Sequence, residues 1–394
     1  MSEWKKVKLG DVVSIKSGLS YKSEFIGQGN NLLLGMGCVS YKENFLDSGV
    51  RPYSQDCDPK YLAAPGDLVL ATRQQSDNLP ILAMPAIIPD KYQGKKIIIG
   101  TNLYRVENNS DIENKFLFFV LKSHDYVNYI RGVKTGTTVQ MVSKRNVEEY
   151  HFLCPPKETR KRIVSILSRY ESLIDNYRKQ IKLLEEAAQR LYKEWFVDLH
   201  FPDHENTKIV DGVPEGWEKK PVDSIYSIKY GKNLSTKLIS ESGEFPVYGA
   251  NGVIGYYDKA NCSEQVVLIT SRGNGSGDVL MTYHKDAFIT NNSFIVSPLE
   301  DYSYCLLPFT YQFLKNANFR AVRTGAAQPQ LTNQSIHTVD VVLPSKDVII
   351  DYCENISYNN RKIILLKNQI RLLTEARDRL LPKLMSGEIE FNFK

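Results

Sequence analysis

The sequence predicts an α+β fold in which two pseudo-repeated, mixed α/β globular domains are separated by two long antiparallel coiled-coil helices. Two observations lead to this prediction. The chain repeats itself with a long period, and a repeat of that kind sets the architecture before any single motif does. Each copy also changes character partway, from a Gly-, Tyr-, Thr- and Val-rich region with frequent turn signals to a long stretch with almost no turn residues.

The repeat is visible at two offsets. Residues 4–18 match residues 217–231 at an offset of 213, because each segment opens on Trp-x-Lys and ends on Lys-x-Gly. Later segments, such as Thr135-Gly136 and Thr324-Gly325, match at an offset of 189. The first copy therefore carries 24 additional residues, the difference between 213 and 189, between its opening strand and its Thr-Gly segment. Surface loops tolerate insertions of this kind.

The turn-poor stretches, residues 158–196 and 347–385, predict two helices with heptad seams. The a and d positions of the first helix are Ile163, Leu167, Tyr170, Ile174, Tyr177, Ile181, Leu184, Ala188, Leu191 and Trp195. Those of the second are Tyr352, Ile356, Asn359, Ile363, Leu366, Ile370, Leu373, Arg377, Leu380 and Leu384. Polar seam residues commonly fix register. The alternative is that each stripe packs on its own globular domain.

Two helices of equal length can pair antiparallel and relate the two globules by a pseudo-two-fold axis. DNA-binding proteins use symmetry and half-site spacing in this way, and two diverged globules would read an asymmetric bipartite sequence. The Leu-Leu-Pro break at Pro382 predicts that the second helix kinks or ends there. Residues 388–393 would then be free to add an edge strand to the first globule.

Composition is that of an ordinary globular protein, with 42% hydrophobic and 24% charged residues in 394 positions. The net charge of +5 permits a nucleic-acid partner without requiring one. The six cysteines form no Cys-x-x-Cys pair, which argues against a zinc site or a disulfide framework. The opening residues form no apolar signal segment and the longest apolar run is short, so we expect a cytoplasmic protein.

Several stretches are typical of one family. They are the two Trp openings and residues 191–196, 248–256, 271–275, 324–331 and 381–389. Together they make the chain resemble, over nearly its whole length, the DNA specificity subunits of type I restriction-modification enzymes. The resemblance implies a target recognition domain in residues 1–155, a helical spacer in 156–200, a linker and second recognition domain in 201–345, and a second spacer and tail in 346–394.

The same resemblance implies a sequence-specific subunit that binds double-stranded DNA, docks two methyltransferase subunits and is joined by restriction/translocase subunits. It implies no cofactor in this chain, with S-adenosylmethionine, and ATP with Mg, in the partners. The residues agree with a non-catalytic subunit. The only Pro-Pro pair, Pro155-Pro156, lacks the Asn/Asp-Pro-Pro-aromatic context in which amino-methyltransferases resemble one another, and it is better suited to stop a strand before a helix.

Candidate DNA contacts are the cations and amides that occupy similar places in both copies, because cations bind phosphates and Arg, Asn and Gln read base edges. Arg73 and Arg272, for example, each follow a predicted buried strand. The candidates in the first copy are Lys16, Tyr21, Lys22, Arg73, Gln74, Gln75, Arg131, Lys134, Thr135 and Thr137. Those in the second are Lys229, Lys232, Arg272, Asn274, Arg320, Arg323, Thr324, Gln328 and Gln330.

Residues 139–141 replace the Gln-Pro-Gln of residues 328–330, so the sequence alone does not equate the contacts of these two segments. The alternative for each cation is a solvated side chain.

Other functions have weaker support. Two carboxylate-Lys groupings could suggest a nuclease, but such short patterns arise often by chance. Pro202 lies between His200 and His204 and disfavours the helix that would align them on a metal. The Gly-rich residues 273–277 lack the Lys-Ser/Thr ending of a P-loop. Two rivals stay open, a coiled-coil scaffold whose globules bind protein and the specificity portion of a different restriction system.

Overall fold

The computed structural model describes residues 4–41, 43–75, 81–240, 242–325, 328–389 and 391. The chain divides into two compact units. The first unit comprises Met1–Ile174 and Leu372–Lys394, and the second comprises Asp175–Arg371. Each unit therefore contains one globule and one half of each long helix.

The first unit is built on a four-stranded antiparallel sheet. Its order is β2 (Val13–Ser17), β10 (Leu103–Asn108), β6 (Leu68–Ala71) and β8 (Pro85–Ile87). A second sheet has the order β4 (Val50–Tyr53), β3 (Ile26–Leu34), β9 (Ile97–Ile99) and β5 (Leu62–Ala63), with β3 and β9 parallel. A short pair joins β1 (Lys5–Lys8) to β12 (His151–Cys154).

Both faces of the central strand β6 are covered, which explains its unbroken apolar sequence. Leu68 and Leu70 pack into one core with the helix α2 (Asn114–Lys122), whereas Val69 and Ala71 pack into another core with β3 and β9. Successive side chains of a strand point to opposite faces. The remaining elements of this unit are α1 (Leu9–Val12), β7 (Arg73–Gln74), α3 (His124–Val133), β11 (Gln140–Met141) and α4 (Lys144–Glu148).

The second unit repeats this plan. Its main sheet has the order β16 (Tyr226–Tyr230), β22 (Ser293–Pro298), β19 (Val267–Thr270) and β20 (Val279–Met281). Its second sheet has the order β18 (Gly252–Tyr257), β17 (Phe245–Gly249) and β21 (Phe288–Ile289), with β17 and β21 parallel. The short pair is β15 (Glu218–Pro221) with β23 (Asp340–Leu343). The other elements are β13 (Ile209–Val210), β14 (Val213–Pro214), α6 (Leu307–Asn316) and α7 (Asn333–His337).

These matching sheet orders confirm the predicted duplication, and the structure also shows where the additional residues lie. The first strand of the main sheet starts at Val13 and Tyr226, an offset of 213, but the central strand starts at Leu68 and Val267, an offset of 199. The next matching strands start at Leu103 and Ser293, 190 residues apart. Most of the insertion in the first copy therefore lies in the two connections that flank β6.

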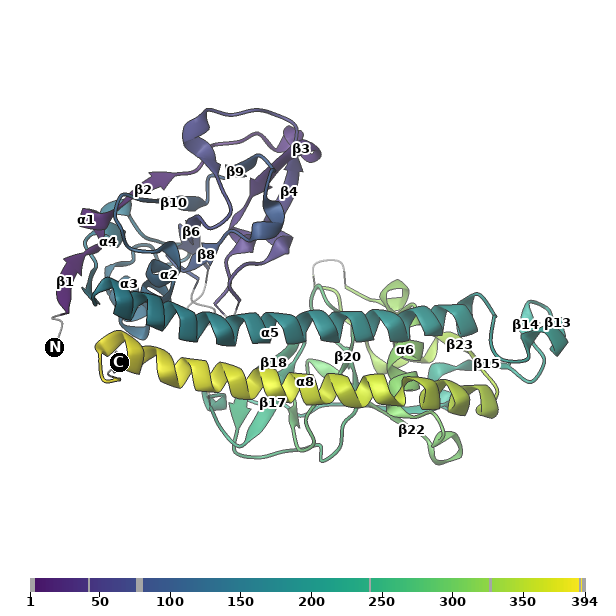
Figure 1. Cartoon of the computed structure of the whole chain (residues 1–394). Coiled ribbons are helices and arrows are strands. Elements are labelled where there is room, and N and C mark those ends of the chain that lie inside the picture. Colours follow the sequence, from purple (N-terminus) through teal and green to yellow (C-terminus); the bar gives the residue numbers. More distant parts are fainter. Residues whose placement is uncertain are drawn as a thin grey trace. The chain divides into compact units, whose positions relative to one another are not determined.

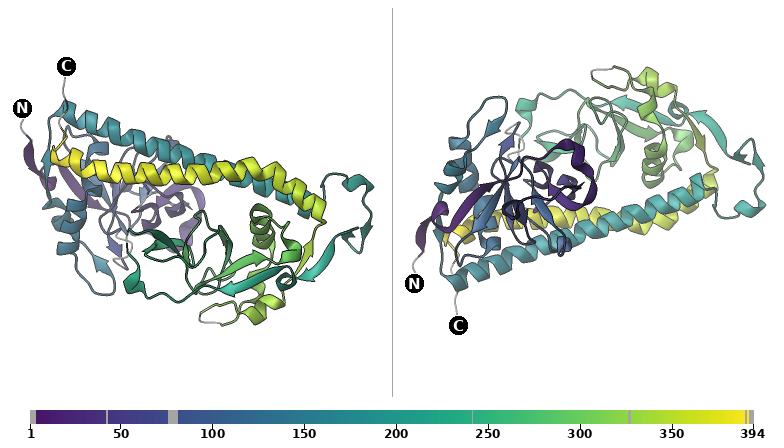
Figure 2. Two further views of the ribbon diagram at one scale, coloured as in Figure 1. Left: turned by 90° about the horizontal axis from the view of Figure 1, so that it is seen from below. Right: turned by 90° about the horizontal axis from the view of Figure 1, so that it is seen from above.

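The long helices are α5 (Lys157–Tyr192) and α8 (Lys346–Ser386), and α5 continues into one π-helical turn, Lys193–Val197. Within each unit the two helix halves lie side by side and antiparallel (Figures 1 and 2). In the second unit, Ile181 clusters with Ile363 and Leu366, and the Tyr352 hydroxyl donates to the carbonyl of Ala188 at 3.1 Å.

All of the seam positions are enclosed to some degree. The buried ones are Ile163, Leu167, Ile174, Ile181, Ala188, Trp195, Tyr352, Ile356, Ile363, Leu366 and Leu384. The half-buried ones are Tyr170, Tyr177, Leu184, Leu191, Asn359, Ile370, Leu373, Arg377 and Leu380. Some of them, including Ile163 and Tyr352, belong to the core of a globule, so the seam packs on the globules as well as along the helix pair.

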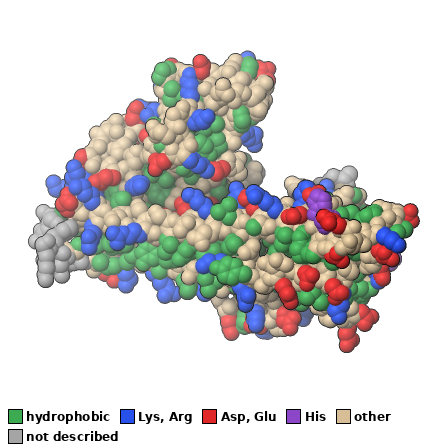
Figure 3. All heavy atoms as spheres, turned by 45° about the vertical axis from the view of Figure 1, so that its right-hand side comes forward, with side chains coloured by type: hydrophobic (Ala, Val, Ile, Leu, Met, Phe, Trp, Pro, Cys, Tyr) green, Lys and Arg blue, Asp and Glu red, His purple; other side chains and the backbone are tan. Residues whose placement is uncertain are grey.

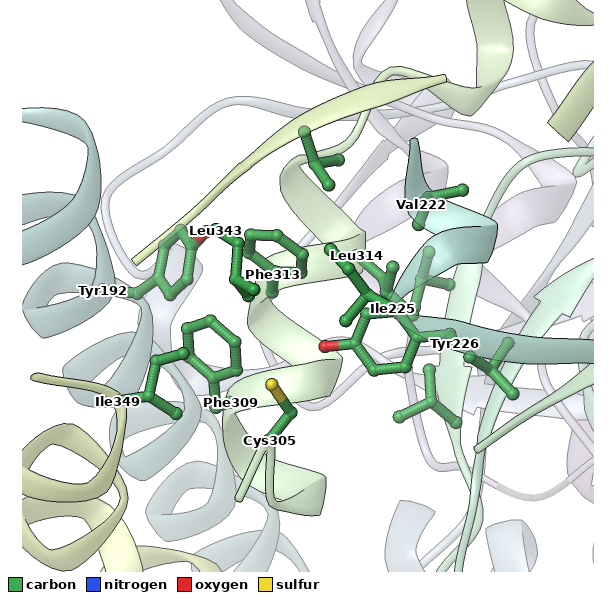
Figure 4. Close-up of a cluster of buried hydrophobic side chains, with 14 of the residues drawn as sticks. Tyr192, Val222, Ile225, Tyr226, Cys305, Phe309, Phe313, Leu314, Leu343 and Ile349 are labelled. Carbon is green, nitrogen blue, oxygen red and sulfur yellow. The ribbon is translucent and has the colours of Figure 1, made fainter. Parts of the chain in front are cut away.

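Aromatic side chains join the helices to the second globule. Figure 4 shows part of one apolar cluster, in which Tyr192 of α5 and Ile349 of α8 lie beside Phe309 of α6. The ring centroids of Tyr192 and Phe309 are 6.5 Å apart. Burial of these large apolar surfaces fixes the helix ends on the globule.

Of the two outcomes expected at Pro382, a kink or an end of the helix, the end is wrong, because α8 continues to Ser386. Leu381, Leu384 and Met385 pack against the core of the first unit, and this burial offsets the hydrogen bond that a proline inside a helix removes. The expected edge strand is also absent at residues 388, 389 and 391, although Ile389 and Phe391 pack on the same core. The other tail positions of that prediction, Glu390, Asn392 and Phe393, lie outside the described residues.

None of the helices in the described part of the chain combines the length and the apolar character that a membrane span requires.

Candidate nucleic-acid interface

In the first unit, three segments meet at the edge of the main sheet where β2 and β6 end. The amide of Gly18 donates to the carbonyl of Leu103 at 3.0 Å, and the amide of Thr72 donates to that of Asn102 at 3.1 Å. The amide of Val142 in turn donates to the carbonyl of Thr72 at 3.4 Å. These bonds bring the ends of β2 and β6 together with the Thr-Gly segment, and most of the candidate residues belong to these segments.

The second unit has the same edge. The amide of Gly231 donates to the carbonyl of Ser293 at 3.0 Å, and that of Ser271 donates to the carbonyl of Asn292 at 2.8 Å. The amide of Leu331 donates to the carbonyl of Ser271 at 2.8 Å. The sequence repeat therefore produces two equivalent surfaces.

Gly18 and Gly231 mark a close approach of two backbones at each edge. A Cβ atom on Gly18 would lie 2.0 Å from the carbonyl oxygen of Gly100, and one on Gly231 would lie 2.3 Å from that of Thr290. Neither space admits a side chain. The matched Lys-x-Gly endings of the two opening strands therefore have a structural cause.

The described parts of the two Thr-Gly segments have the same backbone pairing. Thr135 and Met141 exchange two backbone hydrogen bonds of 2.9 and 2.8 Å, and Thr324 and Gln330 exchange two of 2.9 Å. Gly136 and Gly325 are both left-handed, with φ of 88° and 85°. These hydrogen bonds and glycine conformations therefore match although the sequences of residues 139–141 and 328–330 differ. The side chains of Thr135, Thr137, Thr324, Gln328 and Gln330 are exposed, and Ala326 and Ala327 lie outside the described residues.

Arg73 and Arg272 occupy equivalent positions beside these loops. Arg73 pairs with Met141 between β7 and β11, and Arg272 forms the matching bridge with Gln330. Their side chains differ in exposure. Arg272 is exposed, whereas Arg73 is half-buried and its Nε has no acceptor among the described residues. Arg73 also lies close to Tyr104. Burial raises the pKa of Tyr104, and the positive charge of Arg73 partly offsets that rise.

Gln74 does not fit the role that the sequence predicts for it. Its side chain is only 4% exposed, its amide nitrogen donates to Gln140 at 2.6 Å, and its oxygen accepts from the amides of Ile81 and Leu82. An amide already engaged in this way cannot reach a base edge. The neighbouring Gln75 and the corresponding Asn274 are exposed, so their side chains are accessible to a base edge.

Tyr21 is also held mainly by packing. Its ring makes an edge contact with Tyr53, with centroids 6.4 Å apart, and it belongs to the small apolar cluster of the second sheet. The adjacent Lys22 is exposed, 3.8 Å from the carboxylate of Glu24. Lys22 is therefore the more accessible of these two candidates.

The remaining cations are mostly exposed, and acidic side chains hold some of them. Arg320 donates from Nε and Nη2 to Asp278 at 3.1 and 2.5 Å, and Arg323 donates to the carbonyl of Arg320 at 3.0 Å. Lys16 lies 3.5 Å from Glu107. The other exposed candidates are Arg131, Lys229 and Lys232, and Lys134 and Arg323 are half-buried.

Both edges present exposed cations, some of them paired with carboxylates, together with amide and hydroxyl side chains that can donate and accept hydrogen bonds. Within the described ranges, no group of three or more His, Cys, Asp or Glu side chains is arranged to hold a metal ion. Such a surface can bind polyanions and read polar edges.

One element of the second edge was missed by the sequence analysis of individual residues. The tip of the β17–β18 hairpin, residues 249–254, is tied to this edge because Thr270 Oγ1 donates to the carbonyl of Ala250 at 2.7 Å. Ser293 Oγ also donates to the carbonyl of Gly249, at 3.3 Å. The signal for this hairpin in the sequence is the Gly-x-x-Gly turn inside residues 248–256.

Comparisons with known proteins agree on one family. The model of the type I restriction modification DNA specificity domain matches residues 1–186 and 214–370. The chain is 24% identical to the type I restriction enzyme MjaIX specificity subunit of Methanocaldococcus jannaschii, over 71% of this chain and 69% of that protein. It is 22% identical to the HindI specificity subunit of Haemophilus influenzae, over 99% of this chain and all of that protein.

Among solved structures, the S subunit of a type I restriction-modification system from M. genitalium has a similar fold. The TM-score is 0.52 at 17% sequence identity, over 99% of this chain and 97% of that one.

Proposed function

The chain belongs to the type I restriction-modification DNA specificity family, and we propose that its two units read the two halves of an asymmetric, bipartite DNA site. It is the specificity subunit of a type I restriction-modification system. The observation that carries the proposal is the pair of equivalent edges, which have one backbone plan and different exposed side chains. Equal side chains would favour a palindrome, whereas unequal ones favour two unlike half-sites.

The exposed candidates divide by chemistry into two roles. The lysines and Arg131 supply charge for phosphates and so fix position without reading sequence. Arg272, Asn274, Gln75, Gln328 and Gln330 have the donor and acceptor groups that discriminate base edges in the major groove. Arg320 donates to Asp278 through Nε and Nη2, and that carboxylate fixes the orientation of its guanidinium group.

The proposed partners dock on the long helices. Large apolar side chains are exposed there, including Leu183 at 64%, Tyr358 at 66%, Leu365 at 49% and Leu372 at 55%. Figure 3 shows hydrophobic side chains (green) at the surface along the molecule, with Lys and Arg (blue) among them. We assign this surface to two methyltransferase subunits, joined by restriction/translocase subunits. These partners supply catalysis, with S-adenosylmethionine, ATP and Mg, and flip the target adenine out of the duplex.

The finer architecture is part of the same proposal. Residues 1–155 and 201–345 serve as recognition domains, and residues 156–200 and 346–394 form an antiparallel coiled-coil spacer that measures the distance between half-sites. One heptad inserted into each helix would lengthen the spacer by about 10 Å, or about three base pairs. An unchanged gap between the half-sites would contradict the role of the helices as a ruler.

Salt-dependent binding tests the function against a protein-binding scaffold. The chain, co-purified with the subunits that it brings, is titrated with duplex DNA between 50 and 200 mM salt. We expect the logarithm of the affinity to fall linearly with the logarithm of the salt concentration, because bound cations release counterions from phosphates. Binding that salt does not weaken, or no binding by an intact complex, would favour the scaffold.

A further inference from the structure

We infer that Ile254, at the tip of the β17–β18 hairpin, reads the 5-methyl group of a thymine in the half-site bound by the second unit. The inference rests on the proposed function and deepens it, because it names a specificity-determining residue outside the polar candidates. Its basis is an exposed apolar side chain that is built into a tight hairpin and tied to the candidate DNA edge.

The hairpin is tight and its tip is irregular. Gly249 pairs with Gly252, which leaves Ala250 and Asn251 as a two-residue turn. Farther along, Val247 pairs with Gly255 while Tyr248 pairs with Val253, so Ile254 is the additional residue of a β-bulge. Bulges re-aim side chains and are common beside functional sites.

Ile254 is exposed but held in place. The side chain is 49% exposed, and the neighbouring Val253 is 37% exposed. A Cβ atom on Gly249 would lie 3.0 Å from Cγ2 and 3.2 Å from Cδ1 of Ile254, so the isoleucine side chain packs closely over the backbone of Gly249. Because this packing already limits the rotation of the Ile254 side chain, the side chain loses less conformational entropy when it contacts a ligand.

The tip lies beside polar groups of the candidate interface. Asn251 Oδ1 is 3.2 Å from the position of a Cβ atom on Gly275, in the loop that also carries Arg272 and Asn274. Ala250 accepts a hydrogen bond from Thr270, the residue at the end of β19 before this loop. An apolar side chain surrounded by hydrogen-bond donors and acceptors is complementary to a polar surface that carries a single apolar group. In the major groove of DNA, this apolar group is the 5-methyl group of thymine.

The shape of the hairpin agrees with this target. The major groove admits a two-stranded β-ribbon, whereas the minor groove is about half as wide. The first unit offers no matching ribbon tip in its described residues, because β3 ends at Leu34 and β4 begins at Val50, with a long connection between them. We therefore place thymine recognition of this kind in the second half-site only.

Replacement of thymine by deoxyuridine tests the inference without changing the protein. The complex is titrated with its selected duplex and with duplexes in which each thymine of the second half-site is replaced in turn. At one position the wild-type complex should lose about fourfold in affinity, the effect of removing about one buried methyl group. The variant Ile254→Ala should bind the thymine and deoxyuridine duplexes equally.

The matched control is Ile209→Ala, because Ile209 is 54% exposed on the separate β13–β14 hairpin of the same unit. It should keep the wild-type preference for thymine. A half-site made only of G·C pairs, equal wild-type affinity for every deoxyuridine duplex, or a preference that survives in Ile254→Ala would each overturn the inference. Failure of the unmodified duplex to bind would refute the proposed function itself, and the inference with it.

Discussion

The two units share one backbone plan but hold the long helices by different polar contacts. In the first unit, Arg377 of α8 donates to Glu171 of α5 at 2.7 Å, and Asn44 of the globule donates to the other carboxylate oxygen at 2.8 Å. At the positions related by the 189-residue offset, the second unit has Ala188 and Asn360. There the connecting cation is Lys367, 3.4 Å from Glu185, with its Nζ 3.2 Å from the centre of the Tyr283 ring.

This difference shows that duplication preserved the framework while the polar contacts diverged. The Glu171–Arg377 pair forms only where the first half of α5 meets the last half of α8. If α5 paired with a second copy of α5 in the same register, Glu171 would face Ala188, and if α8 paired with a second copy of α8, Arg377 would face Asn360. A buried charge without a partner is costly, so this pair favours one pairing of helix halves and fixes its register.

The largest expected effect comes from breaking that pair. Arg377→Ala should lower the free energy of unfolding by about 3 kcal/mol, because the Glu171 side chain is only 9% exposed and would lose its countercharge. Urea unfolding measures the change. The comparison is Lys367→Ala, which should cost about 1 kcal/mol because Glu185 is 44% exposed and water can solvate it. Equal costs for the two variants would show that burial does not distinguish the two contacts.

The glycine pair tests how equivalent the two frameworks are. Gly18→Ala and Gly231→Ala each place a Cβ atom against a carbonyl oxygen, at 2.0 and 2.3 Å, and should each cost about 2 kcal/mol through forced backbone shifts. Gly66→Ala is a useful control, because a Cβ atom there meets nothing within 4 Å and only its left-handed φ of 86° opposes the change. If only one of the two edge variants were destabilised, the edges would not be structurally equivalent.

A smaller effect separates buried from exposed amides at the first edge. Gln74→Ala should reduce stability by about 1.5 kcal/mol, because it leaves the amides of Ile81 and Leu82 without their side-chain acceptor. Gln75→Ala should leave stability unchanged and weaken DNA binding. Thermal unfolding and DNA titration of both variants check this. Normal stability of Gln74→Ala would mean that water replaces the lost bonds.

The smallest effect is a pH dependence confined to the second unit. Burial, and then the charge of Arg371, lower the pKa of His284 below 6.5, and its Nδ1 lies 2.9 Å from the Tyr248 hydroxyl. The unfolded chain therefore binds a proton near pH 6.5 that the folded chain does not. Stability should be complete above about pH 6.5 and fall as the pH drops below it. His284→Gln should flatten this dependence in unfolding curves taken from pH 5 to 8, and an unchanged slope would assign it to other groups.

The sequence predicted the features that repeat, because the heptad positions, the Lys-x-Gly endings and the Thr-Gly turns each leave a mark at a fixed offset. It could not predict contacts that depend on tertiary packing. Gln74 and Gln75 look alike in sequence, yet one is enclosed between β11 and residues 81–82 and the other is exposed. Pro382 breaks a helix by local rules, but the burial of its neighbours outweighs the lost hydrogen bond.

The candidate site shows the same limit. The equivalence of Arg73 and Arg272 follows from the repeat, whereas the exposure of Ile254 depends on a bulge that no periodicity reveals.

Selection from a random duplex library tests the central claim most directly. The chain, with its co-purified subunits, is incubated with the library at near-physiological salt, and the bound duplexes are sequenced. Two recognition units with the same framework and different exposed side chains should select two unlike short motifs separated by a fixed gap. A palindrome, a single continuous motif, or no enrichment by an intact complex with S-adenosylmethionine present would contradict the account.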